Sequence, residues 1–212
     1  MKRIIVFDFS GTIIKREVTE EAAGRRLKWL GKTVSKQYLR KALPTNAHYK
    51  LNNDLLKKYT GVKDNSRLNV LSTDLFKIHM YALANEKKKD IFRPGILNII
   101  RKLKKDNYLI AIMSGIRSDI IYGMLKIAKA DVMIDYICAQ NPTLEYSNKQ
   151  LLDCIKNVGK IEFVIGDKLT DIEAAKRVKA KAIFLKGGHP IGGEEKKADF
   201  VISDIKQIFE II

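Results

Sequence analysis

The sequence has few cysteines and no long apolar run, and both absences narrow the possible classes of protein. Only Cys138 and Cys154 occur among its 212 residues. Each lies in an apolar segment, which predicts free buried thiols in a cytoplasmic protein rather than a disulfide framework or a cysteine metal site. No stretch approaches the roughly 18 consecutive apolar residues of a membrane span. The first residues lead straight into a strand pattern, without the regions of a signal peptide. We therefore expect no membrane partner.

Acidic residues are fewer than basic ones, 24 Asp and Glu against 40 Lys and Arg, and the formal net charge is +16. The basic residues are scattered among acids rather than gathered in one arm, so we do not expect a nucleic-acid partner. A positive field would instead attract small anionic molecules. Residues 15–91 hold 18 Lys/Arg and 8 Asp/Glu, whereas the rest of the chain holds 22 and 16. The segment 15–91 is therefore the more basic part.

Two kinds of hydrophobic pattern divide the chain. Residues 4–7 form an apolar run that is typical of a strand buried on both faces. Residues 15–91 then repeat apolar residues at helical spacing, with Thr19 as the expected cap of the first helix and Gly31 as its end. The predicted helices of this segment cover 19–30, 35–43, 47–59 and 66–85.

From residue 92 onward, predicted strands alternate with helical stretches. The strands are expected at 108–113, 134–139, 161–165, 182–185 and 200–202, with a last helix at 205–211. This alternation indicates right-handed crossovers and a mainly parallel sheet covered by helices. The fold class is therefore α/β, Rossmann-like, with 1–14 and 92–212 forming the core and 15–91 forming an all-helical insert after the first strand.

Three of these strands end in polar side chains, namely Asp8, Ser114 and Asp167. Because the carboxyl ends of parallel strands share one edge, these residues are expected to meet. Asp171 would lie in the first turn of the helix after Asp167. Three carboxylates at one edge repel each other unless a cation joins them. Oxygen ligands without His or Cys favour Mg²⁺ over zinc.

A magnesium site with a carboxylate nucleophile suggests phosphoryl transfer. Ser114 and the Gly115 N–H could bind a phosphate near a helix N-terminus. Lys149 is the best-placed lysine to neutralise the phosphate, before a helix that Ser147 would cap. Lys160 is the alternative, although its position at the start of a strand would place it on the opposite edge of the sheet.

These motifs resemble those of the haloacid dehalogenase (HAD) superfamily over the whole chain. The resemblance lies in residues 8–13, in Ser114, in Lys149, and in Gly166-Asp167 with Asp171. It implies a Rossmann-like core, a helical cap at 15–91 and an aspartyl-phosphate formed on Asp8. It also implies Mg²⁺ bound by Asp8, the Ser10 carbonyl, Asp167 and Asp171, with Ser114, Gly115 and Lys149 binding the phosphoryl group.

Ser10 departs from the family pattern. Phosphatases of the family carry an Asp two residues after the nucleophile, as general acid and base. A serine hydroxyl cannot store a proton for a leaving group near neutral pH, and loss of general acid–base help costs about 10²–10⁴-fold in rate. Ser10 therefore favours easier leaving groups, such as acyl or aryl phosphates, and slow turnover.

The sequence thus predicts a cytoplasmic, Mg²⁺-dependent phosphatase acting on a small anionic phosphorylated compound. The alternative is a HAD-fold protein with impaired catalysis that binds a phosphorylated ligand or a partner. Dehalogenation fits less well, because dehalogenases lack the Gly-Asp pair kept at residues 166–167. Phosphonatase chemistry would need a cap lysine, and the surroundings of Lys50 do not resemble that motif. The glycine-rich stretch 186–193 is expected to be a surface loop. The sequence does not indicate the oligomeric state.

Overall fold

The chain folds around a single parallel sheet. The computed structural model describes residues 2–43, 47–139, 148–188 and 192–212, without the side chains of 47–49 and 148–150. Within these residues the strand order is β3-β2-β1-β4-β5-β6, which is a doubly wound order. The strands are β1 (Arg3–Asp8), β2 (Tyr108–Ser114), β3 (Tyr136–Ala139), β4 (Lys160–Gly166), β5 (Lys181–Leu185) and β6 (Phe200–Ile202). The predicted α/β, Rossmann-like class is confirmed.

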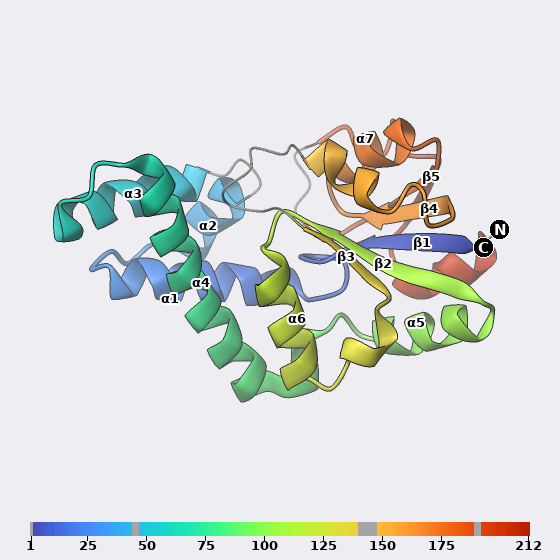
Figure 1. Cartoon of the computed structure of the whole chain (residues 1–212), viewed down its shortest axis with the longest axis horizontal. Coiled ribbons are helices and arrows are strands. Elements are labelled where there is room, and N and C mark those ends of the chain that lie inside the picture. Colours follow the sequence, from blue (N-terminus) through green and yellow to red (C-terminus); the bar gives the residue numbers. More distant parts are fainter. Residues whose placement is uncertain (1, 44–46, 140–147, 189–191) are drawn as a thin grey trace.

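Strand β1 is buried on both faces because its apolar side chains alternate between two cores. Ile5 and Phe7 belong to one cluster, and Ile4 and Val6 belong to the other. The first face is covered by α5 (Ile96–Lys105), α6 (Ser118–Ile127) and the 3-10 helix η4 (Ile205–Glu210). The second is covered by α7 (Leu169–Arg177) and the 3-10 helix η3 (Asn148–Cys154). Figure 1 shows this layered arrangement.

A group of helices lies beyond the carboxyl ends of the strands (Figure 1). Among its described residues, 16–43 and 47–87 contain no strand. Ser35 caps its helix by accepting the N–H of Tyr38, and Asp64 accepts the N–H of Ser66. The elements are α1 (Arg16–Trp29), α2 (Lys36–Ala42), α3 (Ala47–Thr60), α4 (Asn65–Lys87) and the 3-10 turn η1 (Lys88–Ile91).

The chain enters and leaves this helical segment side by side. Ile14 and Phe92 form an antiparallel bridge. On either side of it, the Lys15 N–H donates to the Ile91 carbonyl at 2.8 Å, and the Arg93 N–H donates to the Ile13 carbonyl at 2.9 Å. The two crossings are therefore held together by backbone hydrogen bonds.

Helix α4 of this segment also packs on α6 of the sheet layer. The Tyr81 hydroxyl donates to the Asp119 carbonyl at 2.7 Å, and Lys77 Nζ lies 2.8 Å from the Asp119 carboxylate. The Tyr81 ring lies over Gly123, where a Cβ atom would be 2.1 Å from the Tyr81 oxygen. The helical segment is thus joined to the sheet by a tight contact as well as by the two crossings.

Several local predictions are corrected. Helix α1 begins at Arg16, so Thr19 lies inside it and is not the N-cap. The helix expected after Ser147 and the last helix are present, and both are 3-10 helices, at 148–154 and 205–210. Cys138 and Cys154 are free as expected, but Cys154 is exposed. The capping role of Ser147 lies outside the described residues. In the described part of the chain, no helix is both long and apolar enough to cross a bilayer.

Candidate active site

The site begins where β1 ends. Asp8 is the last residue of β1 and is 4% exposed. The chain then makes a tight turn in which Gly11 has φ +96° and donates its N–H to the Ile14 carbonyl at 2.9 Å. The positive φ explains a glycine at this position. The turn folds the segment after Asp8 back over the strand end.

The second half of the site follows β4, the neighbour of β1. The Asp171 carboxylate accepts the N–H groups of Asp167 and Lys168, both at 3.0 Å, and so caps α7. A Cβ at position 166 would lie 2.2 Å from Asp171 Oδ2, so only glycine leaves room for this carboxylate. The Gly-Asp pair and Asp171 thus form one local unit.

The two halves bring three carboxylates together. Oxygen atoms of Asp8, Asp167 and Asp171 all lie within 4.8 Å of one another, and all three residues are buried. The convergence that was expected from the strand ends is therefore present in the structure. It lies between β1 and β4, where the connections of a doubly wound sheet change direction and ligands bind.

Burial and mutual repulsion perturb the titration of this cluster. Burial first, and then the charges of Asp171 and Asp167, raise the pKa of Asp8 well above its usual value. Burial and the Asp167 charge raise the pKa of Asp171 to about 7. Such shifts mark a site that lacks enough positive charge to keep every carboxylate ionised.

The positive charge of Lys168 acts on both Asp8 and Asp171 and opposes the rise of their pKa values. The sequence analysis did not identify this residue. Burial alone would lower the pKa of its ammonium group. The charges of Asp8, Asp167 and Asp171 outweigh burial and raise that pKa above the usual value. Its position directly after Asp167 was the signal in the sequence. It supplies one positive charge against three carboxylates.

Ser114 lies at the same sheet edge. It is the last residue of β2, one position beyond Met113, which pairs with Asp8. Its Oγ accepts the N–H of Ile116 at 3.1 Å, which leaves its hydroxyl proton for another acceptor. Gly115 is half-buried in the turn between β2 and α6. Both residues are therefore placed at the end of the strand next to the carboxylates.

Ser10 is buried, but its side chain is directed at the helical segment. Its Oγ lies 2.9 Å from Thr19 Oγ1, and the Thr19 hydroxyl donates to the Arg16 carbonyl at 2.8 Å. Because the single proton of Thr19 is already used, Ser10 must be the donor between the two hydroxyls. Thr19 was predicted as a cap and is instead the partner of Ser10.

The loop after β5 is exposed at residues 186–187 and 192–193, as expected, but Gly188 lies against the carboxylate cluster. Gly188 is buried, and a Cβ at this position would lie 1.8 Å from Asp167 Oδ2. Its carbonyl accepts Arg16 Nη1 at 2.7 Å. The prediction of a surface loop is therefore wrong at Gly188, whereas residues 189–191 lie outside the described residues.

The remaining candidate cations lie in different places. Lys160 is the first residue of β4, at the edge opposite Asp8, as its position in the sequence predicted. Lys149 belongs to η3, but its side chain lies outside the described residues. Arg93, which the sequence analysis did not identify, donates from Nη2 to the Gly11 carbonyl and so holds the turn after the strand.

The carboxylate cluster fits a hard divalent cation. Its donors are all oxygen atoms, and within the described residues Asp8 Oδ2 is buried without a hydrogen-bond partner. A buried acceptor without a partner is costly and is expected to meet a ligand. Asp8, Asp167 and Asp171 are therefore the residues that could hold a metal ion such as Mg²⁺.

Comparison with known proteins places the chain in a family. The family described as haloacid dehalogenase-like hydrolase matches residues 5–185, and the chain belongs to it. Among the curated proteins, none matches this sequence.

Solved structures with the same fold cover nearly the whole chain. A predicted phosphoglycolate phosphatase from Haemophilus somnus is 16% identical with a TM-score of 0.76, covering 99% of this chain and 97% of that one. A variant of CbbY from Rhodobacter sphaeroides in complex with xylulose-(1,5)bisphosphate is 18% identical with a TM-score of 0.72, at 96% and 95% coverage. The hydrolase YfnB from Bacillus subtilis, bound to magnesium, is 15% identical with a TM-score of 0.67, at 99% and 98%. At these identities the likeness concerns the fold.

Proposed function

We propose that the chain is a Mg²⁺-dependent phosphatase that hydrolyses a small phosphorylated compound through Asp8. The observation that carries this proposal is the buried cluster of Asp8, Asp167 and Asp171 at the edge between β1 and β4. Family membership supports it, as do the structural relatives, one of which is in complex with a sugar bisphosphate and another bound to magnesium.

The proposed reaction has two steps. A carboxylate oxygen of Asp8 attacks phosphorus, and the bond from phosphorus to the leaving-group oxygen breaks, giving an aspartyl-phosphate. A water molecule then attacks the same phosphorus, releases inorganic phosphate and restores the carboxylate. Ser114, Gly115 and Lys149 would bind the phosphoryl oxygens. A Mg²⁺ ion held by Asp8, the Ser10 carbonyl, Asp167 and Asp171 would supply positive charge for both the carboxylates and the phosphate.

The residue at position 10 restricts which leaving groups the proposed reaction can release quickly. The Ser10 hydroxyl donates to Thr19 and faces the first turn of α1. It therefore supplies no proton to a departing alkoxide, and alkyl phosphates should react slowly. Acyl and aryl phosphates need little protonation of the leaving oxygen. The helical segment 15–91, proposed as a cap over the sheet edge, would exclude water from the reaction.

The same hydroxyl pair favours one alternative, a HAD-fold protein that binds a phosphorylated ligand with little turnover. In this alternative the carboxylates and Mg²⁺ would form a binding site, and the proton donor would be missing. The two functions differ in whether acetyl phosphate is consumed. They also differ in whether an acid at position 10 is needed for any turnover.

The test is a phosphatase assay with Mg²⁺ on acetyl phosphate, para-nitrophenyl phosphate and glycerol phosphate. Wild type should hydrolyse the first two about 10²–10⁴-fold faster than the third, and EDTA should abolish all activity. Asp8→Asn should abolish turnover, whereas Asp106→Asn, which changes an exposed carboxylate, should not. Ser10→Asp should narrow the difference between aryl and alkyl substrates.

Two outcomes would contradict the proposal. Unchanged activity of Asp8→Asn would show that another group is the nucleophile. A wild type that consumes none of the three compounds, combined with turnover by Ser10→Asp, would favour the binding function instead.

A further inference from the structure

The two cysteines of the chain lie next to each other in the fold. Cys138 belongs to β3, where it pairs with Met113 of β2, and its side chain is buried. Cys154 is the last residue of η3 and is exposed. The two thiols are hydrogen bonded to each other. A buried thiol and a thiol that solvent reaches are therefore in direct contact.

The packing of η3 on the sheet explains this contact. Leu151 of η3 belongs to the same hydrophobic cluster as Cys138. In a 3-10 helix the side chains at positions i and i+3 eclipse one another, so Cys154 lies on the same side of η3 as Leu151. The side of η3 that carries Cys154 is therefore the side that packs on β3.

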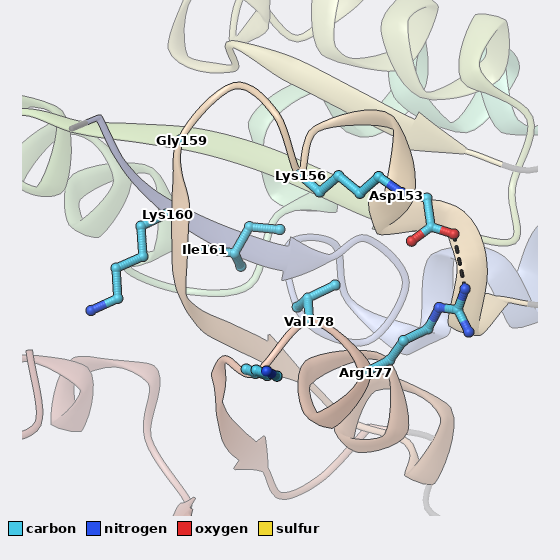
Figure 2. A pocket seen from close by; sticks show the side chains of 8 residues that line it. Asp153, Lys156, Gly159, Lys160, Ile161, Arg177 and Val178 are labelled. Atoms are coloured by element: carbon cyan, nitrogen blue, oxygen red, sulfur yellow. Dashed lines mark hydrogen bonds and ion pairs between the residues drawn. The ribbon is translucent and has the colours of Figure 1, made fainter.

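An ion pair holds the end of η3 on α7. Asp153 Oδ2 lies 3.1 Å from Arg177 Nη2, and Figure 2 shows these two side chains meeting between η3 and α7. Ile155, on the other side of Cys154, is buried in the same cluster as Cys138. The backbone of Cys154 is thus held by both of its neighbours. Two groups held in contact in this way react with little further ordering of the chain.

The hydrogen bond gives the two thiols different chemistry. The bond from Cys138 lowers the pKa of Cys154 to about 7, although partial desolvation of the sulfur and the Asp153 charge oppose this. The same bond, together with burial, raises the pKa of Cys138 above its usual value. Cys154 is therefore partly ionised near neutral pH, whereas Cys138 keeps its proton. An exposed thiolate beside a second thiol is the arrangement of a redox-sensing cysteine with its resolving partner.

We propose that Cys154 and Cys138 form an oxidation site, at which hydrogen peroxide converts the two thiols into a disulfide. The Cys154 thiolate attacks one peroxide oxygen and the O–O bond breaks, which leaves a sulfenic acid on Cys154 and, after proton uptake, one water molecule. The Cys138 sulfur then attacks the Cys154 sulfur. The S–O bond breaks, and hydroxide leaves with the Cys138 proton as a second water molecule. Two electrons pass from the two sulfurs to the peroxide.

The disulfide would join two elements that carry residues of the proposed phosphate site. Lys149 belongs to η3, and Ala139, directly after Cys138, pairs with Ser114 of β2. A disulfide brings its sulfurs to about 2.05 Å, closer than a hydrogen bond does, so η3 must move toward β3. A small displacement of a phosphate-binding residue costs much of the rate. This effect on the rate rests on the proposed function, whereas the formation of the disulfide does not.

The first test treats the reduced full chain with hydrogen peroxide and analyses it by mass spectrometry. The intact mass should fall by that of two hydrogen atoms. A digest should contain one pair of peptides joined through Cys138 and Cys154, which dithiothreitol separates. Before oxidation, Cys154 should react with iodoacetamide at pH 7 at least about tenfold faster than Cys138.

Two variants separate the roles of the thiols. Cys138→Ala removes the resolving thiol and should leave a sulfenic acid on Cys154 that dimedone traps. Cys154→Ser combined with Asp106→Cys keeps two thiols but moves one to an exposed position directly after α5. This matched control should form no disulfide within the chain.

Three outcomes would overturn the oxidation site. Peroxide could oxidise Cys154 beyond the sulfenic acid while Cys138 stays a free thiol, or the disulfides could join separate chains. The control variant could also form a disulfide within the chain as fast as the wild type does. Each would mean that the contact between Cys138 and Cys154 does not direct the reaction.

The second test compares acetyl phosphate hydrolysis by the reduced and the oxidised protein. Oxidation should lower kcat/KM by about tenfold or more, and dithiothreitol should restore it. Cys154→Ser should keep its activity in peroxide. Equal activity of the reduced and the disulfide-bonded wild type would show that the movement of η3 does not reach the phosphate site. If the reduced protein hydrolyses nothing, the proposed function fails, and mass spectrometry still decides whether the disulfide forms.

Discussion

The backbone of Gly188 lies directly against the carboxylate of Asp167. A Cβ at position 188 would stand 1.8 Å from Asp167 Oδ2, closer than any real contact allows. Gly188→Ala should therefore displace either the loop or the carboxylate. We expect about 10–100-fold weaker Mg²⁺ binding, the effect of disturbing groups that support metal ligands.

The Mg²⁺ dependence of activity and of thermal stability measures this effect. Gly24→Ala is the matched control, because its Cβ would meet only the flexible end of Leu39, at 3.3 Å. Equal Mg²⁺ dependence in the two variants would show that the contact of Gly188 with Asp167 does not position the carboxylate.

The hydrogen bond between Ser10 and Thr19 should contribute to stability. Thr19→Val preserves the shape of the side chain but leaves the buried Ser10 hydroxyl without its acceptor. We expect a loss of about 1–3 kcal/mol in the free energy of unfolding, measured with urea. Thr19→Ser keeps the hydroxyl and should lose less. If Val and Ser variants were equally stable, the bond would contribute nothing measurable.

The ion pairs between α4 and α6 should make stability depend on pH. A hydrogen bond from Arg117 and another from Lys77 lower the pKa of Asp119 to about 2. Between this value and the ordinary pKa, the unfolded chain binds more protons than the folded one. The stabilisation is therefore complete above about pH 5 and is lost as the pH falls toward 2.

Asp119→Asn should accordingly lower the free energy of unfolding at pH 7 and have little effect near pH 2. The side chain is 41% exposed, so solvent screening limits the loss to about 1 kcal/mol or less. Urea unfolding across this range measures it, with Asp106→Asn as the exposed control. If the difference in the free energy of unfolding between wild type and Asp119→Asn stayed constant with pH, the effect would come from packing instead.

The contact of Tyr81 with Gly123 should tolerate no extra atom. A Cβ at position 123 would lie 2.1 Å from the Tyr81 oxygen and 2.3 Å from its Cζ. The rigid ring cannot bend away, so Gly123→Ala should destabilise the protein by about 1–3 kcal/mol. Adding Tyr81→Leu should recover part of this loss, which a double-mutant cycle measures. Additive effects of the two changes would exclude a direct clash.

The sheet could be predicted well from the sequence because the patterns that identify its strands are local in the chain. The apolar runs of β1 and β4 are long enough to identify buried strands, and a carboxylate ends β1 and directly follows β4. Parallel strand ends share an edge, so the meeting of Asp8 with Asp167 followed from topology alone. Asp171 followed in turn from the start of α7 just after Asp167.

Contacts between loops could not be predicted in this way. Thr19 has the residue type of an N-cap, but α1 starts at Arg16, directly after the chain crossing where the Lys15 N–H donates to the Ile91 carbonyl. The approach of Gly188 to Asp167 depends on how the loop after β5 packs. Neither the spacing nor the residue types carry that information.

The pairing of Ile14 with Phe92 has a consequence for protein engineering. Because the chain leaves and re-enters the sheet domain at adjacent positions, the whole helical segment behaves topologically as a cassette. A short turn could replace it without stretching the backbone, and a segment from a relative could be spliced in at the same two points. Any replacement would also have to cover the surface of α6 that Tyr81 occupies. Exchange of the segment would therefore depend on matching this helix surface and the contacts of α1 with Ser10 and Gly188, rather than on redesigning the sheet.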